Sequence, residues 1–190
     1  FAQIVCRSPV TVEGVDFAPA HALERHSPGL LVMHAEGNLV RGCRFIARHT
    51  PPNPQASERP SAVHLTAGAT VRLERCHFQL ENISAVMVRD VEVGAPPLPE
   101  GTAPPIVDRF TDGLRQMAWL AGNVLPSSQT ERVAFASCVV PGARAVELRS
   151  LKHEGAALVF EKSLVSADVV LADAWTHAFK PVHVQATSSV

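Results

Sequence analysis

One short stretch of the chain places two carboxylates beside two guanidiniums. These residues are Asp108, Arg109, Asp112 and Arg115. Such a set could bind a polar ligand or a divalent ion, or could divide acid and base roles in hydrolysis. The stretch is equally typical of a solvated loop with a local ion pair and a helix N-cap at Thr111 or Asp112. We favour the loop interpretation, because residue types without convergent geometry are weak evidence for catalysis.

A second candidate set occupies equivalent positions in apolar stretches that we expect to be strands. Val32, His64 and Glu147 share the outward position, together with either Ala118 or Trp119. An outward Trp119 would offer an aromatic face to a carbohydrate, whereas a buried one would fill the edge of the core. We therefore name Trp119, His64 and Glu147 as candidate ligand-binding residues, with a one-residue uncertainty in register.

The nine histidines and four cysteines do not form a metal-binding motif. The sequence contains no His-x-His, His-x-x-x-His or Cys-x-x-Cys pair, although stacking of repeats could bring His34 near His64. It also lacks a Gly-x-Ser-x-Gly elbow and the glycine-rich loops that bind phosphates or dinucleotides. We predict no metal site and no cofactor, and expect calcium only if the chain is an enzyme.

A phrase that recurs along the chain indicates which elements position these residues. It consists of an apolar residue, two spacers, a small residue, a spacer and a second apolar residue. A period of roughly 25 to 33 residues is typical of solenoids and stacked arrays. The copies of the phrase begin at Val12, Val40, Leu73, Phe135 and Phe160.

Each repeat reads as a strand, a glycine turn, a second strand and a variable connection. Strands of this kind bury their apolar faces only when successive coils stack. Stacking would pile Phe17, Phe45 and Phe78 in a single interior column, which Val140 and Val165 continue. Equivalent strands would then pair in parallel from coil to coil.

The small position of the phrase is Cys43, Cys76 and Cys138 in three of the repeats, and Val15 or Ser163 in others. We interpret it as a packing slot of small side chains in the core. Stacked cysteines could come within reach of a disulfide, since neighbouring strands are about 4.8 Å apart. We favour reduced thiols, because they fill the slot equally well.

About two periods separate Leu73 from Phe135. We expect one degenerate coil between them, with strand material from 83–93 and an inserted loop at 94–116. Five prolines, at positions 96, 97, 99, 104 and 105, exclude a central strand from this loop. Loops that leave a rigid solenoid are frequent places for binding sites.

The stacked columns resemble those of the right-handed parallel β-helix superfamily, the pectate-lyase-like solenoids, over most of residues 10–170. The resemblance implies an all-β fold, a right-handed single-stranded parallel β-helix of about five to seven coils. In that superfamily, lyases use carboxylate-bound calcium with an Arg or Lys base, and hydrolases use paired aspartates. The chain has no Asp-Asp pair and no Asp-x-Asp set, so it departs from those catalytic motifs.

Composition narrows the partners. The net charge is −1 over 190 residues, which disfavours nucleic acid and anionic membranes as partners. No apolar run reaches the length of a membrane span and no signal peptide is visible, so we expect a soluble chain. Because the chain opens on Phe1 and neither end has a clear cap, we expect a segment of a longer protein.

Two functions follow as expectations. The first is a non-catalytic β-helix that acts as a scaffold or presents a ligand within a larger bacterial protein. Its partners would be flanking domains of the same polypeptide, a second copy at the open β-helix ends, or a carbohydrate. The alternative is a lyase or glycoside hydrolase acting on an acidic glycan, with the four charged residues of 108–115 as its polar set. We favour the non-catalytic function, since no catalytic cluster is visible.

Overall fold

The computed structural model of the protein describes residues 3–23, 29–49, 60–66, 68–89, 131–149, 156–172 and 182–189. These residues form an all-β structure without a helix, as the sequence predicts. Every pair of neighbouring strands runs in parallel. Within the described ranges, no helix has the length and hydrophobicity that a membrane crossing requires.

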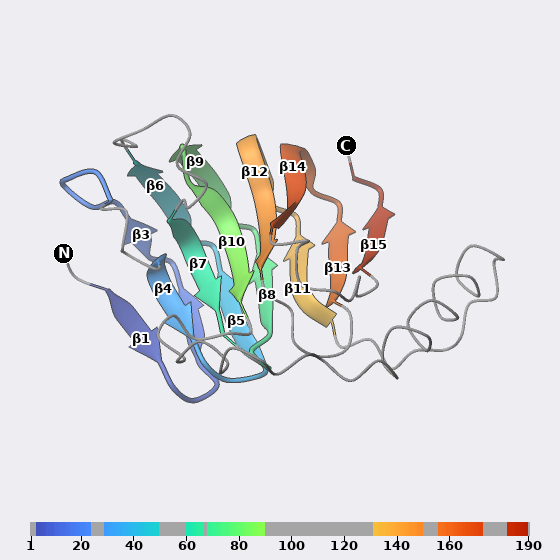
Figure 1. Ribbon diagram of the computed structural model, residues 1–190, viewed down its shortest axis with the longest axis horizontal. Helices are drawn as coiled ribbons and strands as arrows, with labels where there is room; N and C mark the ends of the chain where they lie inside the picture. Colours follow the sequence, from blue (N-terminus) through green and yellow to red (C-terminus); the bar gives the residue numbers. More distant parts are fainter. Residues whose placement is uncertain are drawn as a thin grey trace, which may run out of the picture.

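The strands form two sheets whose members follow one another along the long axis of the molecule (Figure 1). The six-stranded sheet contains β2 (Thr11–Glu13), β5 (Asn38–Arg41), β8 (Val71–Glu74), β11 (Glu131–Ala136), β13 (Ala156–Glu161) and β15 (Val182–Thr187). The nine-stranded sheet contains β1 (Ile4–Cys6), β3 (Asp16–Phe17), β4 (Gly29–Met33), β6 (Arg44–Arg48), β7 (Ser61–Leu65), β9 (His77–Glu81), β10 (Ser84–Arg89), β12 (Val139–Arg149) and β14 (Leu164–Ala172).

The nine-stranded sheet curls strongly because its longest strands belong to both of its halves. The first residue of β12 pairs with β9, through Val139 and His77. Its other end pairs with β10, through Val146 and Val86. The chain passes from a strand of the six-stranded sheet through two strand positions of the curled sheet and returns one position further along. This path fits a parallel β solenoid, and we call each circuit a coil.

The predicted degenerate coil between Leu73 and Phe135 is wrong. Leu73 on β8 pairs directly with Phe135 on β11, so no further coil lies between them. Residues 90–130 instead connect β10 to β11 within the passage from one coil to the next. Arg132 on β11 joins this strand to the turn between β7 and β8. Its guanidinium donates hydrogen bonds to the carbonyl oxygens of Ala69 (2.9 Å) and Thr66 (3.1 Å).

The predicted column of phenylalanine rings is confirmed. The rings of Phe17 and Phe45 stack with centroids 4.7 Å apart, and those of Phe45 and Phe78 with centroids 4.9 Å apart. Both spacings match the distance between hydrogen-bonded strands. In the next coil the ring changes sheet, since Phe78 meets Phe135 edge-on at 6.2 Å, and Phe135 stacks on Phe160 at 5.1 Å. The core therefore keeps one ring in each of these five coils.

Each coil turns between its two sheets through one residue in the left-handed region of φ. Glycine fills this turn position in the first two coils, at Gly14 and Gly42, while the later coils place L-residues there. An L-residue in this region costs about 1–2 kcal/mol relative to a right-handed conformation. The turns stack because the amide of each turn residue from Gly14 to Lys162 donates to a carbonyl oxygen of the next coil. The turn position comprises Gly14, Gly42, Arg75, Ser137, Lys162 and Ser188.

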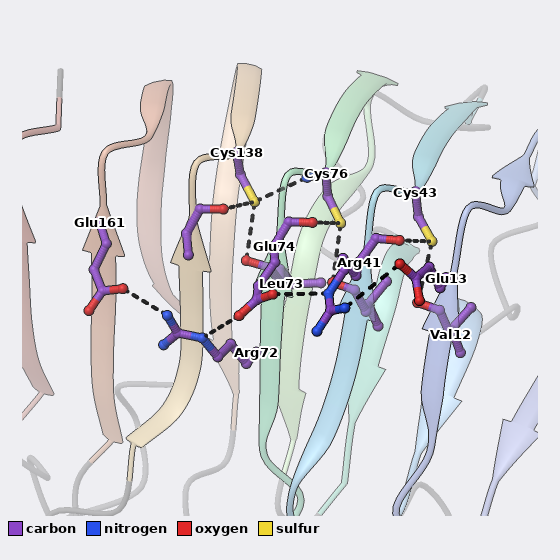
Figure 2. Close-up of polar contacts among 12 residues, drawn as sticks. Val12, Glu13, Arg41, Cys43, Arg72, Leu73, Glu74, Cys76, Cys138 and Glu161 are labelled. Atoms are coloured by element: carbon purple, nitrogen blue, oxygen red, sulfur yellow. Dashed lines mark hydrogen bonds and ion pairs between the residues drawn. The ribbon is translucent and has the colours of Figure 1, made fainter.

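The small slot after the turn makes polar contacts as well as packing contacts, which corrects the interpretation as simple filling. The Ser163 hydroxyl donates to the Phe135 carbonyl oxygen at 3.2 Å and accepts from the Cys138 amide at 3.1 Å. The Cys138 thiol makes equivalent contacts with the carbonyl oxygen of Leu73 (3.3 Å) and the amide of Cys76 (3.4 Å). From Cys43 onward, each slot side chain thus joins its coil to the preceding one, as Figure 2 shows for the cysteines, whereas Val15 in the first coil is exposed.

All four cysteines are free thiols, in agreement with the reduced slot predicted from the sequence. Burial raises the pKa of the Cys43 thiol. The hydrogen bond to Cys138, followed by burial, raises the pKa of the Cys76 thiol. The hydrogen bond with Cys76 lowers the pKa of the Cys138 thiol. At Cys43 and Cys76, the raised pKa values agree with protonated thiols that donate to backbone carbonyls.

Candidate functional site

The sequence-predicted residues fall into two groups. His64 on β7 and Glu147 on β12 both lie in the described structure, on the curled sheet. Asp108, Arg109, Asp112, Arg115 and Trp119 lie outside the described residues, as does the 94–116 loop. Their roles therefore stay predictions.

The structure places Val32, His64 and Glu147 in one column of the curled sheet. Val32 pairs with His64, His64 with Met87, and Met87 with Glu147. Met87 thus occupies the position that the sequence analysis assigned to Ala118 or Trp119. The column is not an open surface, because all four side chains are at least nine-tenths buried.

Glu147 is the centre of a buried polar cluster. Its Oε2 accepts a hydrogen bond from the Ser84 hydroxyl at 2.7 Å and forms an ion pair with Arg144 at 3.1 Å. The carboxylate is completely buried, whereas Arg144 keeps about a fifth of its side chain exposed, at 22%. A buried carboxylate is stable only when it is paired and hydrogen-bonded, and this cluster supplies both.

A second polar array was not anticipated from the sequence and lies on the outer face of the six-stranded sheet. Arg41 pairs with Glu13 at 3.7 Å and with Glu74 at 3.2 Å, so three adjacent strands are joined. Arg72 pairs with Glu74 and with Glu161, each at 2.9 Å. We call Glu13, Arg41, Arg72, Glu74 and Glu161 the charge ladder (Figure 2).

The charge ladder depends on small residues in β11. Register aligns Glu74, Ala136 and Glu161 on consecutive strands, so an alanine separates the two carboxylates. Arg72 lies in the neighbouring column, where its partner on β11 is Ala134. With only methyl groups on β11, the guanidinium reaches across that strand to Glu161. A larger residue at either position would obstruct this bridge.

The sequence does contain a signal for the ladder. Its glutamates and Arg41 occupy the same position of the recurring phrase, directly before the turn residue. Because side chains alternate between the two faces of a strand, that position lies on the outer face, and parallel stacking brings equivalent positions together. A search for charge alternation at this one position would have found the ladder.

Neighbouring arginines lower the pKa values of two carboxyl groups on the surface, one in the ladder and one outside it. The hydrogen bond from Arg72 is the main cause that lowers the pKa of the Glu74 carboxyl. The hydrogen bond from Arg44 likewise lowers the pKa of Asp16, in an exposed ion pair between β6 and β3. A general acid at neutral pH needs a raised carboxyl pKa, so these two groups are suited to permanent ion pairing.

A shallow surface pocket of about 300 Å³ lies beside the end of the ladder. Its lining consists of Ala136, Ser137, Glu161, Lys162 and Thr187. This volume is at the lower limit of small-molecule sites. Within the described residues, no group of three or more His, Cys, Asp or Glu side chains is arranged to hold a metal ion.

Comparisons with known proteins complete the description. No protein-family model matches the chain, and no curated protein or solved structure matches it.

Proposed function

We propose that the chain is a non-catalytic scaffold that presents ligands, built as a right-handed single-stranded parallel β-helix within a larger bacterial protein. The ligand surface is the outer face of the six-stranded sheet with its adjoining turns. The edge strands β2 and β15 each have one described neighbour, and such edges can pair with flanking domains of the same polypeptide or with a second copy.

The observation that carries this proposal is the mutual pairing of charges in the ladder. Arg41 and Arg72 each bridge two carboxylates on different strands. An enzyme that cleaves glycosidic bonds needs two carboxyl groups with separated pKa values facing one substrate. The ladder instead distributes its charges along the axis and couples neighbouring coils, which suits a rigid presenting surface.

Incubation of the protein with neutral and acidic polysaccharides, with and without calcium, tests the proposal. We expect retarded migration in affinity electrophoresis for a polysaccharide ligand, and no unsaturated or reducing-end products. Arg72→Gln should weaken the retardation, since it releases Glu74 and Glu161 from their shared partner. Measurable turnover that Asp112→Ala abolishes and Arg72→Gln leaves intact would reject the non-catalytic function.

An enzyme acting on an acidic glycan is the alternative, and the Glu147 cluster is the observation in its favour. Ser84, Arg144 and Glu147 gather hydroxyl, guanidinium and carboxylate groups on the curled sheet. Glu147→Gln keeps the shape of the side chain and removes its charge. If turnover is found and this variant loses it, the cluster is the active site.

A further inference from the structure

The turn position changes its chemistry along the solenoid. Gly14 and Gly42 have φ values of 67° and 58°, whereas Arg75, Ser137 and Lys162 hold φ values of 51°, 55° and 49°. Glycine is the residue that adopts this conformation without strain. A Cβ added at Gly14 or Gly42 would meet no atom within 4 Å, so the turn leaves open space for a side chain. Arg75, Ser137 and Lys162 thus keep strained side chains where glycine would suffice, as does Ser188 in the following coil at φ 51°.

These three side chains form an exposed ridge along the corner between the sheets. The Arg75 amide donates to Ala136 and the Ser137 amide donates to Glu161, so the three turns stack in consecutive coils. With about 4.8 Å between strands, the Cα atoms of Arg75 and Lys162 are on the order of 10 Å apart, with Ser137 between them. All three residues are exposed.

The two cations of the ridge differ from those of the charge ladder. Arg41 and Arg72 are each held by two carboxylates. Arg75 and Lys162 make no ion pair with another residue of the described structure. Glu74 and Glu161 directly precede Arg75 and Lys162 in the chain, and both of these carboxylates pair with Arg72 at 2.9 Å. The ridge therefore carries local positive charge on a chain whose net charge is −1.

We propose that this ridge binds a tetrahedral oxyanion, a phosphate or a sulfate group. Arg75 and Lys162 supply charge-assisted donors from either side, and the Ser137 and Thr187 hydroxyls donate from the pocket that Lys162 also lines. The inference rests on the proposed ligand-presenting function and names the chemical class of the ligand group. It does not depend on the strand edges or on the Glu147 cluster.

The conformation of the turn provides variants that remove the side chains without threatening the fold. Arg75→Gly and Lys162→Gly relieve the left-handed strain, so each should unfold about 2 °C higher than the parent. Each should also bind oxyanion about tenfold more weakly, because a charge-assisted hydrogen bond is lost. Asn82→Gly is the control, since Asn82 also has a left-handed φ of 56° but lies in the turn between β9 and β10, away from the ridge. It should keep the affinity.

The affinity of the protein for phosphate and for sulfate is measured by NMR titration of its backbone amides with the sodium salts. Sodium chloride keeps the ionic strength constant. Saturable shifts at Arg75, Ser137, Lys162 and Thr187 that both ridge variants lose and Asn82→Gly retains are the expected result. A response equal to that of chloride, shifts that map elsewhere, or unchanged affinity in Arg75→Gly and Lys162→Gly would overturn the inference. The non-catalytic function would survive that outcome, because only turnover of a polysaccharide rejects it.

Discussion

The first three coils and the next two place their aromatic rings on opposite sides of the turn. Phe17, Phe45 and Phe78 follow the slot and stack in the curled sheet. Phe135 and Phe160 precede the slot and stack in the six-stranded sheet. In each of these coils, the inward position on the other side of the turn from the ring holds an aliphatic residue. Leu73 is one example, and it pairs with Phe135 of the next coil. Each of these five coils therefore contributes one aromatic ring to the core, and the ring can lie either before or after the turn.

The slot changes from cysteine to serine one coil later than the ring changes sheet. Cysteine fills it at Cys43 and Cys76, and Cys138 continues it into the fourth coil. Serine fills it at Ser163 and Ser189, with hydrogen bonds to the corresponding carbonyl oxygens. Because thiol and hydroxyl groups both donate to the same kind of acceptor, the slot after the first coil requires a small donor and not a particular residue, whereas Val15 in the first coil is exposed.

The largest effect is expected where the rings change sheet. Phe78→Ala should lower the free energy of unfolding by about 3–5 kcal/mol, because it removes a completely buried ring that touches both stacks. Urea denaturation measures the loss. In the double variant Leu73→Phe with Phe78→Val, the ring of this coil lies before the slot, as in the two coils that follow. This variant should recover more than half of the loss. If the double variant is no more stable than Phe78→Ala, conservation of ring volume is not the rule.

A smaller effect is expected in the slot. Ser163→Ala removes the partner of the Cys138 amide and of the Phe135 carbonyl, so it should cost about 1–3 kcal/mol. Ser163→Cys should cost less, because Cys138 already serves the same contacts one coil earlier. Unfolding in urea compares the two variants. Equal losses in both would mean that the slot is filled only for its volume.

The charge ladder should give a pH-dependent effect that is smaller still. The lowered pKa of Glu74 contributes stability that is present above the ordinary glutamate pKa of about 4.3 and is lost as pH falls through the lower folded value. Arg72→Gln should therefore flatten the acid side of the Tm-versus-pH curve. Thermal unfolding between pH 2 and 7 measures the slope, with Arg48→Gln as the control, since Arg48 on β6 makes no ion pair within the described residues. An unchanged slope would show that the Arg72 bridge does not set the Glu74 pKa.

The isolated pair between Asp16 and Arg44 should have the smallest effect. Both side chains are at least half exposed, so Asp16→Asn should leave the Tm unchanged within error. The pair should instead be visible in titration, since hydrogen bonding by Arg44 holds the pKa of Asp16 below its usual range. NMR titration of the Asp16 carboxyl should show its pKa rising in Arg44→Gln. A large drop in Tm would place this pair with the ladder.

Much of the fold could be predicted because it depends on local alternation. The inward column from Val12 through Val40, Leu73 and Phe135 to Phe160 follows the recurring phrase, and the observed registers match it. The candidate sites were less predictable. His64 and Glu147 share a column as their phrase positions suggest, but both are buried, whereas the sequence analysis placed them on an outward surface.

By itself, the sequence determined the repeat, the inward columns and the outward position before each turn, since side-chain direction alternates with every residue of a strand. Only the tertiary structure decided that β8 and β11 are direct neighbours, because loop-closure entropy rises slowly with length and a long connection between paired strands is nearly as acceptable as a short one. It also decided that Arg72 crosses β11 to Glu161, since that reach depends on the small alanines of the strand between them. Which charges pair, and which stay available for a ligand, follows from these neighbours in space.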